Sequence, residues 1–419
     1  MNELPEGWKL VKLGEICKMK NGFAFKSTEY TDEGTPVIRI SDINGGIVST
    51  EKSVRVKDKN EFEDFLVEKG DILVAMSGAT TGKFGLFGTN EKAYQNQRVG
   101  KFKILNIKVL DRQFLYYQIN SLKRLIEKDA YGGAQPNISS GKIEQMNFVL
   151  PPLPIQHAIV TKIEEIFSEL DHGVEQLKTA RQQLKVYRQS VLKWAFEGRL
   201  TNPNIVEGEL PAGWKWAKTG EVINTINNGY TPTKEYLSEG SGEIPFIKVY
   251  NLNFDGTLNF KKNPTYIPAA VHQKDLKRSI CFPGDVLINI VGPPLGKISV
   301  VTDQFPEWNI NQAIVLFRPN EKVTSKFIAY FMQNSVTINW LENTSKATAG
   351  QWNVKVSTCR EIPMPLVPLT EQHQIVSEIE RRLSVCDKLE DTIEAGLKQA
   401  EVLRAGVLKM AFEGRLVGS

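Results

Sequence analysis

The sequence has few of the features that indicate a membrane, secreted or metal-binding protein. No run approaches the roughly 18 apolar residues that a membrane span needs, and the first residues show no signal-peptide pattern. The four cysteines are scattered, without the short spacing of a disulfide framework or a zinc site. The four histidines show no metal-ligand spacing either. We therefore expect a cytoplasmic protein with no metal and no membrane contact.

An excess of charge of one sign is also missing. The chain has 52 Lys and Arg residues against 48 Asp and Glu residues, a formal net charge of +4. That charge is too small to identify a nucleic acid as the partner on its own. The apolar fraction of 41% is ordinary for a protein that buries a core, and 419 residues allow two or three domains. Composition thus bounds the class of protein without naming its function.

What the sequence does contain is a repeat of about half its length. The motif Leu-Pro-x-Gly-Trp-Lys begins at Leu4 and returns at Leu210, and Ala-Phe-Glu-Gly-Arg-Leu begins at Ala195 and returns at Ala411. Solenoid units run about 20–50 residues, so a repeat of this size indicates a duplicated domain. Length changes between the halves fall in the globular parts, whereas the last part of each half aligns without a gap. This pattern suggests a fixed frame that carries two variable domains.

Each globular part is predicted as an α/β (α+β) domain with short, mostly antiparallel strands. Runs rich in β-branched residues predict strands at corresponding places in the two halves, namely residues 35–40 and 71–76 and residues 243–249 and 285–290. A helix is expected at 111–128, with its counterpart at 324–343. The predicted segments are a first globular domain at 1–153, a helix at 154–200, a second globular domain at 201–367 and a second helix at 368–419.

A glycine-containing loop follows the second of these strands in each half. Its Gly-x-x-x-Gly-Lys spacing ends at Lys83 and at Lys297. A phosphate-binding P-loop needs four residues between its glycines and Ser or Thr after the lysine, so the spacing argues against nucleotide hydrolysis. The loop is either a strand connection whose glycines take positive φ, or it approaches a DNA backbone. In the second case the lysines would contact phosphates, with Ser77, Thr80 or Thr81 nearby.

Amide side chains recur at two further places in each half. They are Asn96, Gln97, Gln135 and Asn137 in the first half and Asn311, Gln312, Gln351 and Asn353 in the second. Such amides can bond adenine bidentately, and Arg98 could do the same to guanine. Alternatively, the amides brace loops by bonding to the main chain. Recurrence in both halves favours bracing, because readers of two different sequences should differ where they touch bases.

Two long helices are predicted, at residues 155–197 and 370–413. Proline precedes the first turn of each, and glycine follows the last. Apolar residues recur every seven positions, with a second row between them, which is the spacing of a coiled coil. The seven-residue seam consists of Ile163, Leu170, Leu177, Leu184 and Val191 in the first helix and Ile379, Cys386, Ile393, Ala400 and Val407 in the second. Each helix would be about 65 Å long, which is longer than such a domain is wide. Two helices of equal length, each after its own globular domain, pair most simply with each other, so we expect an antiparallel coiled coil.

Together these motifs resemble the specificity subunit of type I restriction-modification systems. The resemblance covers the whole chain and rests on the repeated Leu-Pro-x-Gly-Trp openings, the Gly-Asp-strand-Gly-x-x-x-Gly-Lys segments, the Pro-Leu-x-x-Gln helix starts and the Ala-Phe-Glu-Gly-Arg-Leu ends. It implies two target-recognition domains that read the two halves of an asymmetric, bipartite duplex DNA site, with the helices setting the spacer. It also implies two modification subunits that methylate adenine with S-adenosylmethionine, and restriction subunits that join them. The chain itself would bind no cofactor.

No catalytic motif accompanies these features. The segment from Asn263 to Tyr266 comes near the Asn-Pro-Pro-aromatic motif of an amino-methyltransferase, but it lacks the second proline and has no counterpart in the first half. We expect a turn there and no enzymatic activity. Two alternatives stay open: a self-contained nucleotide- or S-adenosylmethionine-dependent enzyme, and a two-headed scaffold that tethers proteins. Binding of ATP or S-adenosylmethionine by the isolated chain would favour the first, and failure to bind duplex DNA beside a methylating partner would favour the second.

Overall fold

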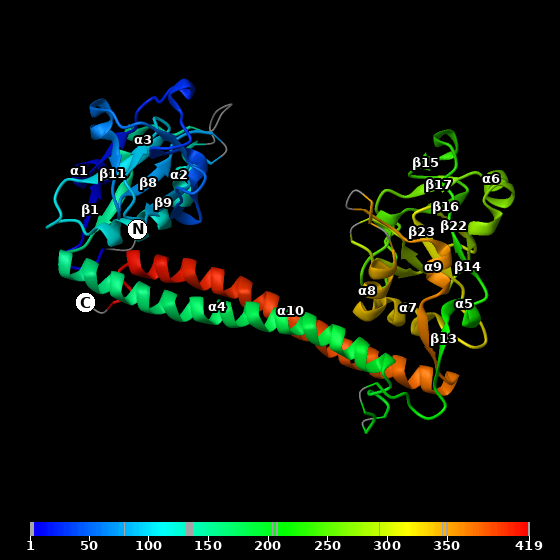
Figure 1. Cartoon of the computed structure of the whole chain (residues 1–419). Coiled ribbons are helices and arrows are strands. Elements are labelled where there is room, and N and C mark those ends of the chain that lie inside the picture. The colour runs from blue at the N-terminus through cyan, green and yellow to red at the C-terminus, as the bar shows by residue number, and fades with distance from the viewer. Residues whose placement is uncertain are drawn as a thin grey trace. The chain divides into compact units, whose positions relative to one another are not determined.

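The chain folds into two compact units (Figure 1). The computed structural model describes residues 4–417 except 79, 131–136, 203, 207, 293, 346 and 349–350, and gives the backbone alone at 122–125, 127–130, 347–348 and 351. Unit 1 comprises Met1–Leu177 and Ala395–Ser419, and unit 2 comprises Lys178–Glu394. Each unit therefore combines one globular domain with parts of both long helices. The predicted domain boundaries stay predictions, since the two units divide the chain within these helices.

In unit 1 a six-stranded sheet carries much of the core. Its order is β2 (Cys17–Asn21), β11 (Val99–Ile104), β8 (Ile72–Ala75), β9 (Phe84–Phe87), β5 (Gly46–Val48) and β4 (Ile43–Asn44). A second sheet has the order β6 (Val54–Val56), β3 (Thr35–Ile38), β10 (Ala93–Gln95) and β7 (Leu66–Val67), and β1 (Lys9–Lys12) pairs with β12 (Asn147–Leu150). The α-helices of this domain are α1 (Leu13–Ile16), α2 (Arg112–Ala130) and α3 (Ser140–Glu144). Among its described strands, only β3–β10 and β5–β9 pair in parallel.

Unit 2 repeats this plan with changed details. Its sheets have the orders β14 (Ile226–Asn228), β23 (Ile314–Phe317), β19 (Val286–Asn289), β21 (Ile298–Val300), and β15 (Ser238–Glu239), β17 (Thr265–Ile267), β16 (Ile244–Ile247), β22 (Trp308–Ile310), β18 (Ile280–Cys281). Smaller sheets are β13 (Lys215–Lys218) with β26 (Pro363–Leu366), and β20 (Val291–Gly292), β25 (Gln351–Asn353), β24 (Ala347–Thr348). The α-helices are α5 (Thr219–Val222), α6 (Ala269–Lys274), α7 (Ser325–Gln333), α8 (Ser335–Thr344) and α9 (Val356–Arg360). The predicted fold of short, mostly antiparallel strands with helices is confirmed.

One predicted helix is wrong in its continuity. The segment expected as a single helix at 324–343 forms α7 and α8, which are separated by Asn334. This residue is extended (φ −67°, ψ 126°), and its side-chain oxygen accepts a hydrogen bond from the main-chain N–H of Val336 at 3.1 Å. Asparagine is among the best helix N-caps because its side chain satisfies an otherwise unpaired N–H. The cap therefore ends one helix and begins the next.

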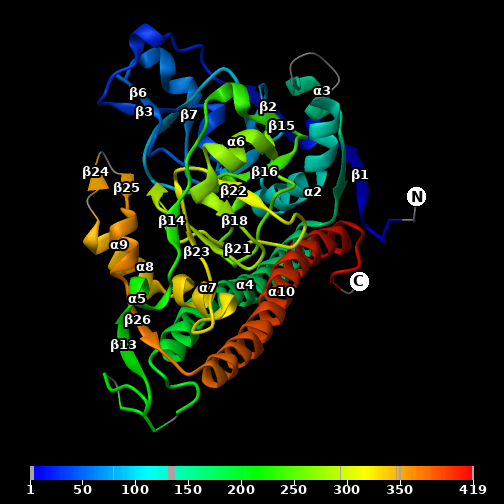
Figure 2. The same ribbon diagram turned by 90° about the vertical axis from the view of Figure 1, so that its right-hand side faces the viewer.

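The two long helices, α4 (Leu153–Phe196) and α10 (Leu369–Phe412), run antiparallel (Figure 2). In unit 1 Asp171 of α4 pairs with Arg404 of α10. In unit 2 Arg181 pairs with Glu394 at 2.8 Å, and Arg188 pairs with Asp387 at 2.7 Å and with Glu390 at 2.9 Å. Partner numbers fall along α10 as they rise along α4, which is the direction of an antiparallel pair. The predicted coiled coil is confirmed.

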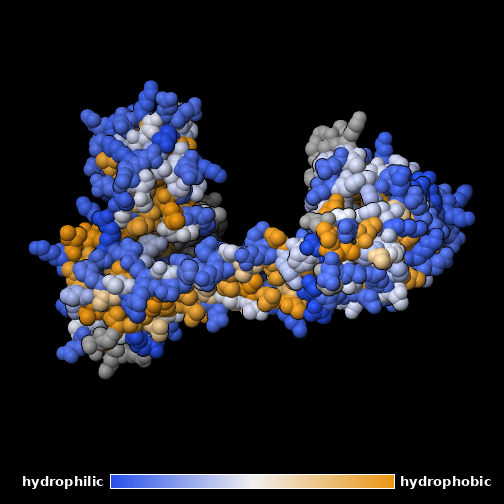
Figure 3. Space-filling model, turned by 60° about the horizontal axis from the view of Figure 1, so that its bottom comes forward, coloured by the Kyte–Doolittle hydropathy of each residue, from blue (hydrophilic) through white to orange (hydrophobic). Residues whose placement is uncertain are grey.

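The predicted seam residues are buried to different degrees. Eight of the ten are 9% exposed or less, and Leu170 and Leu177 are half-buried; the eight are Ile163, Leu184, Val191, Ile379, Cys386, Ile393, Ala400 and Val407. The second row is fully buried at Ile159 and Ile375, where the helices pack on the domains, but four of its other members, Tyr187, Leu389, Leu403 and Met410, are 39–49% exposed. Two helices cover only a strip of each other's surface, so the second row leaves apolar surface along them (Figure 3).

Each globular domain packs on the beginning of one long helix and on the end of the other. In unit 1 the core includes Ile159 of α4 and Phe412 of α10, whose ring lies 5.6 Å from that of Phe114. In unit 2 it includes Ile375 of α10 and Phe196 of α4. Burying such side chains contributes roughly 1.5–3 kcal/mol each. The helices are therefore part of both cores rather than free connectors.

The two ends of the repeat close in the same way. Gly198 after α4 and Gly414 after α10 have φ of +77° and +72°. A Cβ atom at these positions would lie 2.2 Å from Pro211 and 2.3 Å from Pro5, respectively. Both the left-handed conformation and the close approach require glycine. The Leu-Pro-x-Gly-Trp segment thus packs against a helix end in each unit.

A buried glutamine fixes the start of each long helix to its domain. Gln156 is fully buried; its Oε1 accepts from the N–H of Asp111 at 2.8 Å, and its Nε2 donates to the carbonyls of Val109 at 2.8 Å and Pro151 at 2.9 Å. Gln372 in unit 2 makes the equivalent three bonds at 3.1, 2.7 and 2.9 Å. The amide has both the acceptor and the donors that this junction needs.

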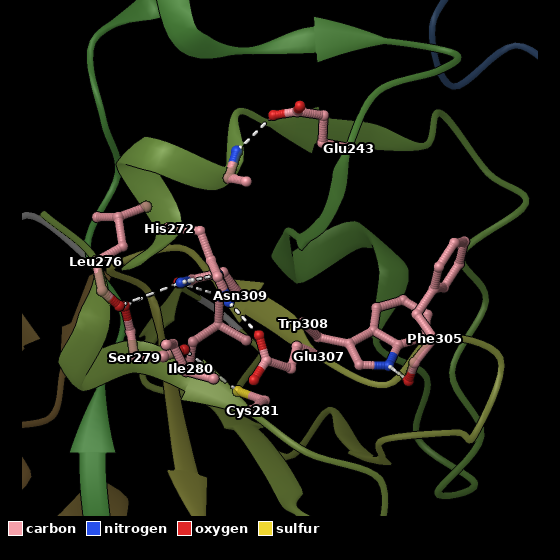
Figure 4. A network of polar contacts seen from close by, with 12 residues as sticks. Glu243, His272, Leu276, Ser279, Ile280, Cys281, Phe305, Glu307, Trp308 and Asn309 are labelled. Carbon is pink, nitrogen blue, oxygen red and sulfur yellow. Dashed lines mark hydrogen bonds and ion pairs between the residues drawn. The ribbon is translucent and has the colours of Figure 1, made fainter. Parts of the chain in front are cut away.

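A second buried network braces the five-stranded sheet of unit 2 (Figure 4). His272 of α6 is fully buried, with its Nε2 3.0 Å from Glu307 Oε2 and its Nδ1 3.1 Å from Asn309 Nδ2. Asn309 Oδ1 also accepts from the hydroxyl of Ser279 at 2.8 Å. Because the amide donates to Nδ1, Nε2 carries the proton and donates to Glu307. This neutral tautomer joins α6 to β22.

Candidate nucleic-acid interface

Three segments that recur in both halves of the sequence meet at the end of β8 in unit 1. The main-chain N–H of Met76 donates to the carbonyl of Arg98 at 2.9 Å, and the N–H of Ile138 donates to the carbonyl of Met76 at 2.9 Å. Ser77 forms an antiparallel bridge with Asn137. The glycine loop, the Asn-Gln segment and the segment that ends at Asn137 therefore form one surface.

Unit 2 has the same convergence at the end of β19. The N–H of Ile290 donates to the carbonyl of Ala313 at 2.8 Å, and the N–H of Val354 donates to the carbonyl of Ile290 at 2.9 Å. Val291 pairs with Asn353 where β20 meets β25. The sequence showed that these segments recur, but not that they touch. Their contact depends on the sheet, which brings together segments far apart in the chain.

In unit 1 the glycine loop is internally braced. Both glycines have positive φ, +83° at Gly78 and +85° at Gly82, as expected for a strand connection. Thr81 is 2% exposed and its hydroxyl donates to the Gly78 carbonyl at 2.6 Å, so it lies within the loop and does not face a ligand. Thr80 is half-buried and donates a long bond of 3.4 Å to a main-chain carbonyl. Lys83 is half-buried and is the loop's cation.

In unit 2 a buried asparagine that the sequence reading missed braces the equivalent loop. Asn289 is 2% exposed; its Nδ2 donates to the Pro294 carbonyl at 3.0 Å, and its Oδ1 accepts from the N–H of Lys297 at 2.9 Å. The signal in the sequence was that Asn289 is the only polar residue in the otherwise apolar strand β19. The ammonium of Lys297 lies over the ring of Phe254, 5.9 Å from its centroid.

The amides divide into buried braces and exposed residues. Gln95 is fully buried and donates to two main-chain carbonyls at 2.6 and 2.7 Å, and Asn96 is 9% exposed. Gln97, Arg98 and Gln312 are exposed. Bracing therefore falls to Gln95, which lies just before the predicted segment, and to Asn96 within it, whose Oδ1 accepts from the N–H of Arg98 at 3.3 Å. The exposed members of the set are free to face a ligand.

The remaining predicted residues lie at the edge of the same surface. Asn137 and Asn353 are exposed, and the hydroxyl of Ser77 is buried without a hydrogen-bond partner among the described residues. Gln135 and the side chain of Gln351 lie outside the described residues. The surface thus presents the lysine of each glycine loop together with exposed amides.

Gly22, which was not predicted from the sequence, lets the main chain pass close to the segment at Gln95 and Asn96. A Cβ at Gly22 would lie 2.2 and 2.3 Å from the carbonyl oxygens of Gln95 and Asn96. Gly229 has the same environment, at 2.1 and 2.2 Å from two carbonyls. The signal was an Asn-Gly-aromatic triplet in both halves, beginning at Asn21 and Asn228. Only glycine permits this approach, so the triplet positions the Asn-Gln segment.

The recurring Gly-Asp motif is structural. Asp71 accepts from the main-chain N–H of Glu68 at 2.9 Å and from Lys101 Nζ at 3.1 Å. Asp285 is 2% exposed and binds Arg318 at 2.8 Å. The hydrogen bond from Arg318 to Asp285 raises the pKa of that arginine. These carboxylates brace the turn before β8 and β19 and are not part of the exposed surface.

Comparison with known proteins agrees with this two-domain organisation. A family model described as type I restriction modification DNA specificity domain matches residues 5–184 and again 211–399. The type I restriction enzyme EcoBI specificity subunit of Escherichia coli is 27% identical over 432 residues, covering 99% of this chain and 87% of that protein. The MjaVIII specificity subunit of Methanocaldococcus jannaschii is 21% identical over 430 residues, covering 99% of this chain and 94% of that protein.

Solved structures share the fold. A crystal structure of the HsdS subunit from Thermoanaerobacter tengcongensis has a TM-score of 0.61 at 19% identity, with 99% of this chain and 98% of that chain covered. At this identity the likeness shows the fold alone. None of the helices in the described ranges is long and apolar enough to cross a membrane. With a family match in each half, the chain belongs to the type I restriction-modification DNA specificity family.

Proposed function

We propose that this chain reads an asymmetric, bipartite duplex DNA target, one block through each recognition domain, within a type I restriction-modification complex. Homologues in this family are specificity subunits, so the chain has a DNA-specificity role and is not itself an enzyme. The main support for a bipartite target is that three recurring segments meet on one surface in each unit. Its main-chain bonds are the same in both units, whereas its side chains differ.

One of the differences falls at an exposed residue, Arg98. Arg98 in unit 1 is replaced by Ala313 in unit 2 at the residue whose carbonyl accepts the equivalent hydrogen bond. Ser77 is likewise replaced by Val291 at the position that pairs with Asn137 or Asn353. Arginine can bond guanine O6 and N7, whereas alanine offers only a methyl group. The same main-chain arrangement with different side chains supports two recognition domains that prefer different DNA bases.

The exposed apolar residues of the long helices support a scaffolding role. Val186 and Tyr187 of α4 are 59% and 39% exposed, and Val402 and Leu403, which lie at the equivalent positions of α10, are 65% and 46% exposed. Exposed apolar surface that recurs in a repeat fits a partner present in two copies. We propose two modification subunits as these partners, with S-adenosylmethionine held by them, and restriction subunits joining the complex. Cellular DNA as the substrate fits the expected cytoplasmic location.

The test is to co-express the chain with its modification subunit in cells that lack adenine methylation and to map methylated adenines across the genome. We expect one asymmetric motif of two defined blocks around a fixed gap. Arg98→Ala should relax one block and leave the other unchanged, with Lys162→Gln on the exposed face of α4 as the control. A motif without a gap would contradict the two-reader arrangement. An assembled complex that methylates nothing would favour the tethering alternative.

A further inference from the structure

Unit 1 contains a hollow of about 510 Å³ beside the glycine loop. Lys83 of the loop and Arg404 of α10 line it, with the aromatic rings of Phe84, Tyr117 and Phe167 among the other lining residues. None of the described residues that line it is acidic. Aromatic walls with cations and no carboxylate are suited to a bound anion.

The two cations of this hollow are held differently. The guanidinium of Arg404 lies over the ring of Phe167, 4.7 Å from its centroid, and pairs with Asp171. Its side chain remains 31% exposed. The side chain of Lys83 makes no ion pair with any residue that the structure describes. Asp171 offsets part of the arginine's charge, so Lys83 supplies the uncompensated positive charge of the hollow.

Unit 2 contains an equivalent hollow of about 600 Å³ whose charge is reversed. It is lined by Arg188, which corresponds to Arg404 in the repeat, and by four carboxylates, those of Asp255, Glu380, Asp387 and Glu390. The last two hold Arg188 at 2.7 and 2.9 Å. Lys297, the counterpart of Lys83, is not among the lining residues.

A tyrosine lies in each hollow, and in both units its pKa is raised mainly by burial. Burial, followed by the negative charges of Glu380 and Asp387, raises the pKa of Tyr330 in unit 2 to about 12. Tyr117 holds the corresponding place in unit 1, where burial is again the main cause that raises its pKa; Glu164 raises this pKa as well, and Arg404 lowers it slightly. The difference between the hollows therefore lies in their lining, where unit 2 places carboxylates and unit 1 places Lys83.

We propose that the hollow of unit 1 binds a phosphate of the DNA backbone through Lys83 and Arg404, and that the hollow of unit 2 does not. The two recognition domains would then engage the DNA backbone unequally. The inference rests on the proposed function, because it needs duplex DNA as the ligand. Phosphate contacts fix the position of a protein on the duplex without reading its sequence. Unequal contacts would set the orientation of the chain on its asymmetric target.

The test measures duplex binding by the assembled complex with its modification subunits across a range of salt concentrations. Each phosphate contact contributes about 0.9 to the slope of log K against log salt concentration. Lys83→Gln should lower the slope by about one, and Arg404→Gln by less than that because Asp171 already offsets part of its charge; both losses should be equal on target and non-target duplexes. Arg188→Gln and the surface control Lys162→Gln should leave the slope unchanged. Arg404→Lys should restore most of it, which separates lost charge from damaged packing.

Three results would overturn the inference. An unchanged slope for Lys83→Gln in a complex that still binds its target would refute the phosphate contact and leave the proposed function intact. An equal loss of slope for Arg188→Gln would refute the inequality between the units. Binding of ATP or inorganic phosphate to the chain alone, abolished by Lys83→Gln, would assign the hollow to a small ligand instead. If the unaltered complex binds no duplex at all, it is the proposed function that fails.

Discussion

Replacing Gln156 should detach the start of α4 from its domain. This fully buried amide makes three hydrogen bonds of 2.8–2.9 Å to main-chain groups around it. Gln156→Leu removes one acceptor and two donors and leaves the part-buried Asp111 N–H and Val109 carbonyl, and the buried Pro151 carbonyl, without these partners. An unsatisfied buried group costs roughly 1–3 kcal/mol. We therefore expect unit 1 to lose about 3 kcal/mol or more of unfolding free energy.

Gln156→Glu sharpens the prediction because it keeps the shape and the acceptor. Its second oxygen would face the carbonyls of Val109 and Pro151 instead of donating to them. Burial beside two carbonyls should raise the pKa of the introduced carboxyl above its unfolded value. The penalty should be full at neutral pH and should shrink as pH falls through that raised pKa, because the protonated acid can donate again.

The assay is urea unfolding of the full chain, with hydrogen exchange to locate the loss. Exchange should increase around residues 109–114 and at the start of α4, and should stay unchanged at the equivalent junction of unit 2. His157→Gln is the matched control, since that side chain is 60% exposed and lies 3.7 Å from Asp111; we expect a change within about 0.5 kcal/mol. A Gln156→Leu variant as stable as the control would refute the reasoning.

Three further predictions concern other parts of the chain. Arg98→Ala should weaken discrimination between bases at one position of the target by about 1–3 kcal/mol. The measurement compares binding to four duplexes that differ only in the base at that position. Equal weakening on all four would contradict base reading. Glu371 accepts a hydrogen bond from the indole N–H of Trp214 at 2.8 Å and another from Thr201 in the linker after α4. In Glu371→Ala the tryptophan emission should therefore shift to the red, and protease should cleave the linker faster. An unchanged spectrum and cleavage rate would argue against this brace. Hydrogen bonds from Arg381 and Arg382 lower the pKa of Glu378 from its ordinary range to about 2. The stabilisation from these bonds is therefore complete above the unfolded pKa and is lost as pH falls towards 2. Because those arginines are partly exposed, Glu378→Gln should cost less than about 1 kcal/mol at pH 7, and a difference from wild type that persists at pH 2 would exclude the ion pairs as its cause.

Much of the architecture could be predicted because it depends on local patterns. The strand runs, the two long helices and their seam follow from residue type and from periods of two and seven positions. The split at Asn334 is also local, since it comes from a capping side chain, but a single asparagine within an apolar pattern is easily passed over. The exposure of Leu389 and Leu403 could not be predicted from the period, because the width of the strip that one helix covers on another depends on their packing.

The candidate site was predicted only in part. The sequence marked the segments that contain Lys83, Gln97 and Asn137, because they recur in both halves. It could not show that they meet at Met76, nor that Thr81 turns into its own loop. The first fact depends on hydrogen bonds between segments separated by tens of residues, and the second on a local bond from Thr81 to the Gly78 carbonyl. Burial decided which amides brace and which are exposed.

By itself, the sequence determined that the chain is a duplicated pair of α/β domains on two antiparallel helices, because repeats and heptads are written along the chain. Only the tertiary structure decided which side chains share a surface. The charge of the two hollows is the clearest case, because Lys83 and Arg404 line one and the four carboxylates line the other. These residues come from distant segments with similar composition. Their electrostatic effect depends on distance and burial, and folding alone sets both.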